Sequence, residues 1–457
     1  MTETLIYESR NSQIYLLDTS EWGVPTIRKT LNNEYPSPAE IAVFYNEFDI
    51  ISGLNAPGIR KVLKRDRYKR RHAMYLEYVD SETLADGFAG KQNDIVDFLH
   101  LAIAISRALA EIHKCNIIHK DISPVNILIN LQNRSATIID FGLSSKLDIK
   151  NPYLGNPQRL EGNLAYMSPE RTGRMNRTVD YRSDLYSMGA VFYEMLAGRP
   201  VFPASDAMAL VHSHLAQTPD PLHEVKQKVP AAISNLIGRK LAKNAEERYQ
   251  TAEGVIHDLS RCLAEFEQNA KIEPFDLGDN DHSGKFQIPQ KLYGRARETA
   301  TLMQAFESAA DGALNMVLLA GYSGTGKSAL VSELHKPITE KCGHFIEGKF
   351  DQFQRVVPYF AILQAFQSYI DLLLTEREEY LLELRETIQN AVGKEGRVVT
   401  SVLPNLELII GEQPAVPDIG GAETQHRFNY VFSRFVEAIS SKNHPITLFI
   451  DDLQWAD

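Results

Sequence analysis

Two neighbouring segments decide the fold of the first half of the chain: IIHKDISPVNIL at residues 117–128 and TIIDFGLS at residues 137–144. The first segment carries Asp121 and Asn126, and the second carries Asp140 in an Asp-Phe-Gly run. Carboxylate and amide oxygens are the ligands that Mg²⁺ prefers in proteins. Asn126 and Asp140 are therefore candidate metal ligands supplied by two different loops.

Two further charged residues precede these segments, one on a predicted strand and one on a predicted helix. Lys29 lies in the predicted strand TIRKTL, and Glu47 follows 18 positions later (47 − 29) in a predicted helix. Ser37 and Pro38 are typical of a helix start. Apolar residues then recur at the three-to-four spacing of one helix face: Ile41, Phe44, Phe48 and Ile51.

Together these residue types suit the transfer of a γ-phosphoryl group, a reaction that depends mainly on the placement of charge. A lysine must neutralise phosphate oxygens and a helix carboxylate must hold that lysine, which are roles for Lys29 and Glu47. Another carboxylate must orient the acceptor hydroxyl and take its proton, which is a role for Asp121. The set predicts a phosphotransferase that uses ATP and Mg²⁺, with Lys29, Glu47 and Asp121 as catalytic residues.

In this order the motifs resemble a eukaryotic-type serine/threonine protein kinase domain that covers residues 1–265. The resemblance implies an α+β fold with two lobes, the first rich in strands and the second rich in helices, and with ATP between them. It implies that Lys29 and the hinge from Glu77 to Val79 bind ATP, and that protein hydroxyls are the substrate. Residues farther along the chain have structural roles in this family.

Three such residues match by position. The resemblance implies that Arg248 pairs with Glu170, and that Asp184 braces the backbone of the catalytic loop. His119 is expected to pack as a backbone brace rather than to act as a catalytic histidine.

The sequence departs from the kinase pattern at three places. The loop that normally reads G-x-G-x-x-G is ESRNSQIY, from Glu8 to Tyr15, and contains no glycine. Ser123 stands where serine/threonine kinases carry a lysine near the γ-phosphate. Lys120 replaces an arginine that can clamp a phosphate with two parallel hydrogen bonds, which lysine cannot do.

A second functional unit follows a segment without periodicity. Residues 266–291 are rich in Asp, Asn, Gly and Pro and are predicted to be a linker ahead of a domain at 292–457. There, GYSGTGKS follows the predicted strand NMVLLA and opens the predicted helix ALVSELH, which is the context of a phosphate-binding loop. Loop amides cradle phosphates, the lysine reaches them and the serine hydroxyl is a ligand of Mg²⁺: Gly321, Gly324, Gly326, Lys327 and Ser328.

The partner motif is HPITLFIDDLQWAD, a predicted strand that closes on two acids. Asp451 is a candidate Mg²⁺ ligand, and Asp452 is a candidate for orienting water at the bound nucleotide. The alternation of predicted helices and strands indicates an α/β domain with a parallel sheet. With KLYGRARE ahead of them, these motifs resemble the AAA-related, STAND-type ATPases of bacterial signalling regulators.

The two resemblances together point to large bacterial signal-transduction kinases, in which sensory and histidine-kinase regions follow. Such regions are the expected partners on the full-length chain. Later strands and a basic residue that stabilises transition-state charge are not found after Asp452. We therefore expect an incomplete P-loop NTPase domain, truncated after its second acidic motif, which binds nucleotide weakly and hydrolyses it slowly.

The composition excludes a disordered, collagen-like or disulfide-scaffold protein. The chain has 457 residues, of which 44% are hydrophobic and 23% charged, as in folded domains with real cores. The net charge of −11 argues against general nucleic-acid binding. No apolar stretch reaches the ~18–20 residues of a membrane helix. The cysteines are odd in number and far apart, which favours a cytoplasmic protein: Cys115, Cys262 and Cys342.

Two alternatives to an active kinase remain open at this point. The chain could be a pseudokinase scaffold that binds nucleotide without phosphotransfer, which Ser123 and the missing glycines favour. The P-loop domain could instead be the functional core, with the kinase domain as its lid. The basic run at residues 60–72 is either a docking patch for an acidic partner or, as we favour, a solvated hairpin.

Overall fold

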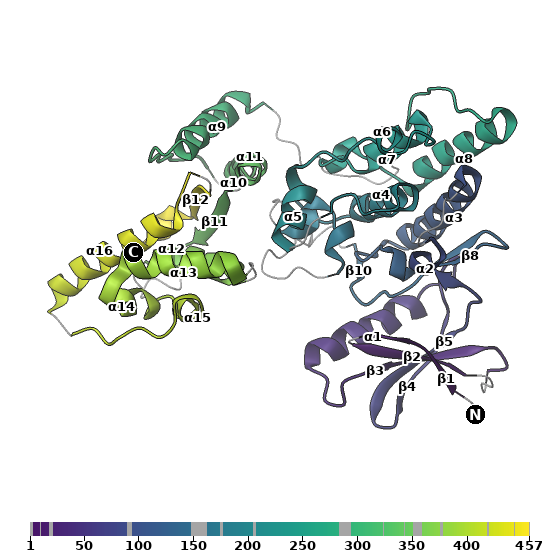
Figure 1. Ribbon diagram of the computed structural model, residues 1–457, viewed down its shortest axis with the longest axis horizontal. Coiled ribbons are helices and arrows are strands. Elements are labelled where there is room, and N and C mark those ends of the chain that lie inside the picture. Colours follow the sequence, from purple (N-terminus) through teal and green to yellow (C-terminus); the bar gives the residue numbers. More distant parts are fainter. Residues whose placement is uncertain are drawn as a thin grey trace.

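The first half of the chain folds into two lobes, and a unit of helices with a small parallel sheet follows (Figure 1). This agrees with the fold class expected from the sequence. The computed structural model describes residues 3–9, 11–17, 22–88, 94–147, 162–173, 177–203, 207–282, 294–322, 324–341, 343–350, 359–374, 378–417, 420–442 and 444–456.

The first lobe is an antiparallel sheet with the strand order β1-β2-β3-β5-β4. Alternate residues of a strand face the same side, so Lys29 lies on the side of Ile27 and Leu31, which pack with Phe44 of the adjoining helix. The sheet thus turns Lys29 toward that helix. The strands are β1 (Glu3–Glu8), β2 (Ser12–Leu17), β3 (Thr26–Leu31), β4 (Val62–Tyr68) and β5 (Arg71–Glu77).

Helix α1 (Pro38–Ser52) packs against this sheet and begins as the sequence predicts. The Ser37 hydroxyl accepts a hydrogen bond from the Glu40 N–H at 3.3 Å, and the Ser37 N–H donates to the Glu40 carboxylate at 2.7 Å. This reciprocal capping box satisfies donors that the first turn leaves unpaired. The cap fixes where α1 starts, and therefore which face of the helix carries Glu47.

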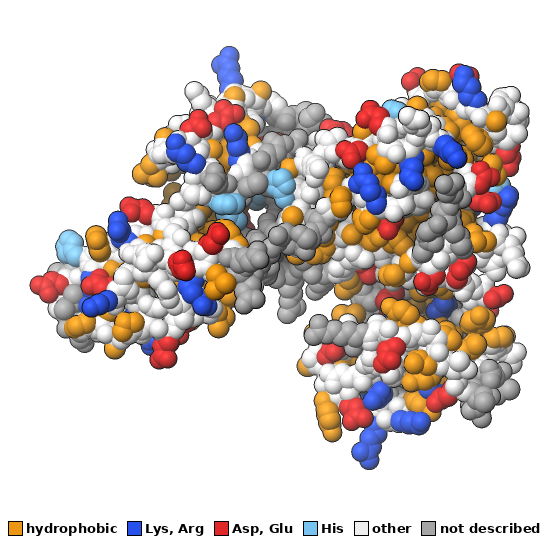
Figure 2. Space-filling model, viewed as in Figure 1, with side chains coloured by type: hydrophobic (Ala, Val, Ile, Leu, Met, Phe, Trp, Pro, Cys, Tyr) orange, Lys and Arg blue, Asp and Glu red, His pale blue; other side chains and the backbone are white. Residues whose placement is uncertain are grey.

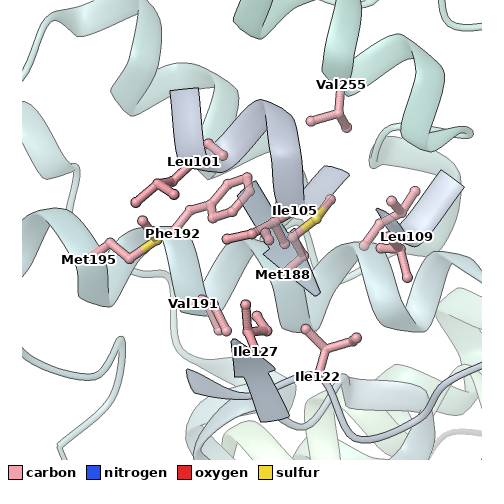
Figure 3. Close-up of a cluster of buried hydrophobic side chains, with 14 of the residues drawn as sticks. Leu101, Ile105, Leu109, Ile122, Ile127, Met188, Val191, Phe192, Met195 and Val255 are labelled. Atoms are coloured by element: carbon pink, nitrogen blue, oxygen red, sulfur yellow. The ribbon is translucent and has the colours of Figure 1, made fainter. Parts of the chain in front are cut away.

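The second lobe is built around two long buried helices, α3 and α4. Ile105 of α3 lies with Met188 and Phe192 of α4 in the centre of the core, where all three side chains are fully buried (Figure 3). The strands and helices of this lobe are β6 (Glu82–Thr83), α2 (Leu84–Phe88), α3 (Ile95–Lys114), β7 (Ile117–Ile118), β8 (Ile127–Asn130), β9 (Ser135–Ile138), β10 (Ser145–Lys146), α4 (Arg182–Ala197), α5 (Ala207–Ala216), α6 (Leu222–Val225), α7 (Ala231–Lys240) and α8 (Ala252–Asn269).

One residue of this core is a lysine. Lys240, at the end of α7, has no exposed surface, and its ammonium has no hydrogen-bond partner among the described residues. Its Nζ lies 4.2 Å from the ring centroid of Phe192. This cation–π contact offsets only part of the free-energy cost of burying the ammonium. Burial lowers the pKa of Lys240 well below its usual value. The amine therefore costs folding free energy at neutral pH.

We expect Lys240→Leu to raise the free energy of unfolding by about 1–4 kcal/mol, the range found when well-packed apolar residues replace buried ion pairs. Lys240 binds a proton more tightly in the unfolded chain than in the folded protein. The free energy of unfolding of the wild type should therefore rise between pH 7 and pH 10. Chemical denaturation across this pH range measures both effects. A Lys240→Leu variant that is less stable, or that keeps the same pH slope, would contradict this interpretation.

The predicted linker at 266–291 needs revision in its first part. Helix α8 continues to Asn269, and residues 270–282 pack back onto the second lobe. Asp281 accepts hydrogen bonds from the Gln250 N–H at 2.6 Å and from the Thr251 hydroxyl at 2.7 Å. These contacts join residues about 30 positions apart, which a composition rule cannot detect. Residues 283–291 of the predicted linker lie outside the described residues.

The second unit contains a two-stranded parallel sheet, in which Lys349 of β11 is opposite Asp451 of β12. Helices surround these strands, and their apolar side chains form a separate core. The elements are α9 (Ala296–Ala310), α10 (Lys327–Ser332), α11 (His335–Glu340), β11 (His344–Lys349), α12 (Phe360–Leu373), α13 (Glu378–Val392), α14 (Gly396–Thr400), α15 (Glu407–Ile410), α16 (Gly421–Ile439) and β12 (Ile446–Asp451).

One local prediction for this unit was wrong, and another was confirmed only in part. The segment NMVLLA at 315–320 forms no strand, and Met316 and Leu318 are 92% and 70% exposed. An apolar run becomes a strand only when a neighbouring strand pairs with it, and none of the described residues does so. The helix predicted over ALVSELH is divided between α10 and α11.

The basic run at 60–72 forms the hairpin of β4 and β5, as the favoured interpretation expected. The turn lies at Lys69 and Arg70, and Lys and Arg side chains project from this end of the first lobe (Figure 2). Within the described residues, none of the helices is both long enough and apolar enough to cross a membrane.

Candidate active site

Lys29, Glu47 and Asp140 form a charged cluster between the two lobes. The Lys29 ammonium lies 2.6 Å from the Glu47 carboxylate and 3.5 Å from the Asp140 carboxylate. Glu47 is 4% exposed, whereas Asp140 is partly open to solvent. The ion pair expected from the placement of Lys29 on a strand and Glu47 on a helix therefore forms, and it reaches the loop that carries Asp140.

Electrostatics within this cluster favour the charged form of both Lys29 and Asp140. Burial alone would lower the pKa of Lys29, but Asp140 and Glu47 outweigh it and raise that pKa. The nearby Lys29 charge lowers the pKa of Asp140. An ammonium and a carboxylate thus face the space between the lobes, where they could contact a phosphate and a metal ion.

The catalytic loop brings Asp121 and Asn126 together. The Asn126 side-chain amide donates to the Asp121 carboxylate at 2.8 Å and to the Asp121 backbone oxygen at 2.9 Å. The Ile139 N–H donates to the Asn126 backbone oxygen at 3.0 Å. Because Ile139 directly precedes Asp140, this bond aligns the two loops that carry the candidate metal ligands.

Asp184 braces the catalytic loop, as the resemblance implies. Its buried carboxylate accepts hydrogen bonds from the backbone N–H groups of His119 and Lys120, each at 2.8 Å. The His119 ring is fully buried and lies 3.1 Å from the Ile139 backbone oxygen. The His119 side chain is therefore packed as a structural residue.

The oxygen ligands fit Mg²⁺ better than they fit a transition metal. Among the described residues, no group of three or more His, Cys, Asp and Glu side chains could hold a metal ion on its own. Mg²⁺ is usually bound by one or two protein oxygens together with water and substrate phosphates. Asp140 and Asn126 offer such a partial ligand set.

Sequence reasoning missed a contact on Asp121 from the segment after the second loop. The Asn163 backbone N–H donates to the Asp121 carboxylate at 3.1 Å, so both carboxylate oxygens are engaged. Ser123 is fully buried, and its hydroxyl has no hydrogen-bond partner within the described part of the chain. One of the two donors that orient the Asp121 carboxylate is thus a backbone group, which no residue type reveals, and the other is the Asn126 side chain.

Gly162 makes this contact possible. Its φ is +92°, and a Cβ atom there would lie 2.7 Å from the Asp121 carboxylate. We expect Gly162→Ala to lower the phosphotransfer rate by about 10²-fold, the scale of a 1 Å misplacement of a reacting group. Initial rates of phosphate incorporation measure this loss.

Gly198→Ala is the matched control. Gly198 also has a positive φ of +73°, but no atom lies within 4 Å of a Cβ atom placed there. Alanine at either position is strained by the positive φ, but only Gly162→Ala should lose activity. Equal losses in both variants would refute the role given to Gly162.

The loop without glycines is closed by serine hydroxyls instead. The Ser12 N–H donates to the Ser9 hydroxyl at 3.0 Å, and the Ser9 N–H donates to the Ser12 backbone oxygen at 2.8 Å. Arg10 in this loop lies outside the described residues. At the predicted hinge, Glu77 ends β5, and the Val79 backbone oxygen accepts from the Ser81 hydroxyl at 2.9 Å. The binding of adenine there stays a prediction.

In the second unit the glycine-rich loop precedes α10 as the motif requires. Gly324 and Gly326 have φ values of +80° and +83°. The Lys327 ammonium donates to the backbone oxygens of Gly321 and Tyr322 at 2.9 and 3.1 Å. The lysine thus folds back over the loop where the motif would place phosphates. Ser328 is in the first turn of α10.

The two acids of the second motif lie at the end of β12. The Asp451 carboxylate accepts from the Asp452 N–H at 2.8 Å. Hydrogen bonds from Gln454 and Lys349 and the nearby charge of Lys327 lower the pKa of Asp452. The Lys349 ammonium is 3.1 Å from the Asp452 carboxylate. Sequence reasoning missed Lys349, because its position became significant only when β11 paired with β12.

Comparison with known families agrees with this geometry. Residues 10–260 match the protein kinase domain family, and residues 291–457 match the AAA ATPase domain family. Since the first match covers more than half of the chain, the chain belongs to the protein kinase family. An AAA ATPase domain follows its kinase domain, in the order expected from the sequence.

The curated relatives that the chain matches are named as kinases. The chain is 33% identical over 312 residues to hybrid signal transduction histidine kinase G of Dictyostelium discoideum, covering 64% of this chain and 9% of that protein. It is 28% identical over 265 residues to a probable serine/threonine-protein kinase of Clostridium perfringens, covering 57% and 37%. It is 31% identical over 252 residues to serine/threonine-protein kinase PknB of Mycolicibacterium smegmatis, covering 54% and 39%. The chain therefore spans well under half of the length of each of these relatives.

Proposed function

We propose that the chain is a serine/threonine protein kinase that transfers the γ-phosphoryl group of ATP to protein hydroxyls, with a regulatory P-loop ATPase domain attached. The observation that carries this proposal is the position of Lys29, which contacts Glu47 at 2.6 Å and Asp140 at 3.5 Å. This arrangement places one cation and one carboxylate ready for a nucleotide phosphate and its metal ion.

Each residue of the first site has a role in this proposal. Asp140 and Asn126 hold Mg²⁺, which neutralises charge on the phosphates when it is bound. Lys29 binds phosphate oxygens, and the backbone from Glu77 to Val79 binds adenine. Asp121 orients the acceptor hydroxyl and takes its proton.

A test of this proposal is incubation of the full chain with radiolabelled ATP, Mg²⁺ and a generic acceptor protein. Lys29→Met should lower incorporation by at least about 10²-fold, since it removes a cation near the transferring group. A wild-type protein that binds ATP without incorporation would instead support the pseudokinase alternative. Phosphoamino-acid analysis of the product would test the choice of serine and threonine.

The second domain has a narrower proposed role. Lys327, Ser328 and the loop glycines hold nucleotide phosphates, Asp451 holds Mg²⁺, and Asp452 orients water. The ATPase match and the names of the signalling relatives support a regulatory module, with sensory or histidine-kinase regions as partners on a longer protein. Lys327→Ala should abolish nucleotide binding at this site while leaving binding at the kinase site.

A further inference from the structure

The side chain of Asn46 connects helix α1 to the loop that carries Asp140. Its amide donates to the backbone oxygens of Ser144 at 2.8 Å, Gly142 at 2.9 Å and Phe141 at 3.4 Å. These residues are nearly 100 positions away in the sequence. One half-buried side chain thus engages three backbone oxygens within the four residues that follow Asp140.

A close backbone approach accompanies these hydrogen bonds. Val43 precedes Asn46 by three residues and lies on the same helix face. A Cβ atom at Gly142 would lie 2.8 Å from the Val43 side chain, so glycine at position 142 lets the loop lie close to α1. Phe141 is fully buried and packs on the His119 ring at 4.8 Å between centroids. The loop is therefore held from both sides.

Asn46 and Glu47 are adjacent, and each contacts the part of the site that carries one of its two charges, Asp140 or Lys29. Glu47 holds the Lys29 ammonium, and Asn46 holds the backbone that follows Asp140. We propose that Asn46 is a positioning residue that fixes the Asp140 carboxylate for Mg²⁺ binding and ties its place to that of α1. This inference rests on the proposed function, because it takes Asp140 to be the metal ligand.

An amide suits this position because it offers two N–H donors to a group of carbonyl oxygens. Leucine has a similar volume but no donor, and it would remove the hydrogen bonds that Asn46 donates to those oxygens. Partners of metal ligands typically change metal affinity or activity by about 10–100-fold when they are removed. We expect an effect of this size on Mg²⁺-dependent nucleotide binding.

The test measures the affinity of the full chain for ATP in the presence of MgCl₂ and in the presence of EDTA, by calorimetry. All proteins carry Lys327→Ala, so that the second nucleotide site is silent. Asn46→Leu should reduce the gain in affinity that Mg²⁺ provides by at least about 10-fold. Asn46→Gln, which keeps the amide, should recover part of the gain. Asp49→Asn changes an exposed position of the same helix and should leave the gain unchanged.

The double variant Asn46→Leu/Asp140→Asn distinguishes positioning from a general structural role. If Asn46 acts through Asp140, the double variant should show the same Mg²⁺ gain as Asp140→Asn alone. Additive losses, or a normal Mg²⁺ gain in Asn46→Leu, would overturn the inference, as would a wild-type protein with no Mg²⁺ gain. The wild-type protein could show a Mg²⁺ gain that Asn46→Leu removes and yet transfer no phosphate. That result would support the role of Asn46 and reject only the proposed kinase activity.

Discussion

Asp140→Asn should abolish most phosphotransfer while leaving the protein folded. A bound metal ion stabilises charge in the transition state by several kcal/mol, and each 1.4 kcal/mol corresponds to about a tenfold change in rate. We therefore expect a loss of about 10²–10³-fold in the initial rate of radiolabel incorporation. The carboxylate is partly exposed and faces Lys29, so its replacement creates no cavity in the core.

Asp97→Asn is the control for this prediction. Asp97 lies on the exposed face of α3, where its carboxylate is 3.3 Å from the Arg134 guanidinium. Its substitution removes the same charge from an exposed surface pair and should leave the rate unchanged. Thermal unfolding should give similar midpoints for both variants. Full activity in Asp140→Asn would rule out the metal role given to this residue.

The largest expected effect on stability comes from the pair formed by Glu170 and Arg248. Two hydrogen bonds join the carboxylate to the guanidinium at 2.7 and 2.8 Å, and the Arg248 side chain has no exposed surface. Glu170→Gln leaves the guanidinium charge buried without a counterion. Breaking a buried pair in this way costs about 3–5 kcal/mol, so we expect that loss in the free energy of unfolding.

The same pair should make wild-type stability depend on acid pH. Burial alone would raise the pKa of Glu170, but Arg248 and the Ser183 hydroxyl lower it to about 2. A group with a lowered pKa stabilises the fold above its unfolded pKa of about 4.3, and this contribution disappears as the pH falls toward 2. Denaturant midpoints should therefore fall more steeply with pH in the wild type than in Glu170→Gln.

Glu246→Gln provides the comparison with an accessible pair. Glu246 lies 3.1 Å from Arg177, and both side chains keep some exposure. Such pairs contribute less than about 1 kcal/mol, so this variant should remain near wild-type stability. If Glu170→Gln and Glu246→Gln lowered the free energy of unfolding by similar amounts, burial of the pair formed by Glu170 and Arg248 would not be the cause of the loss.

The sequence alone determined those features that depend on residue type at short range. The helix start at Ser37 and Pro38, the Asp-Phe-Gly run and the glycine-rich loop before Lys327 each depend on a few adjacent residues. Their local geometry has few solutions, so the pattern identifies it. The pairing of Lys29 with Glu47 was also predictable, from their placement on a predicted strand and a predicted helix and from the charges that phosphoryl transfer requires.

The contacts between residues of ordinary type that lie far apart in the chain could be identified only from the three-dimensional structure. Nothing near Asn46 in the sequence indicates that its amide reaches Gly142, and nothing near Lys240 indicates that this lysine is buried. The segment at 315–320 has the composition of a strand, yet no described strand pairs with it. Burial, strand pairing and long-range hydrogen bonds depend on which segments meet in three dimensions, and local composition does not contain that information.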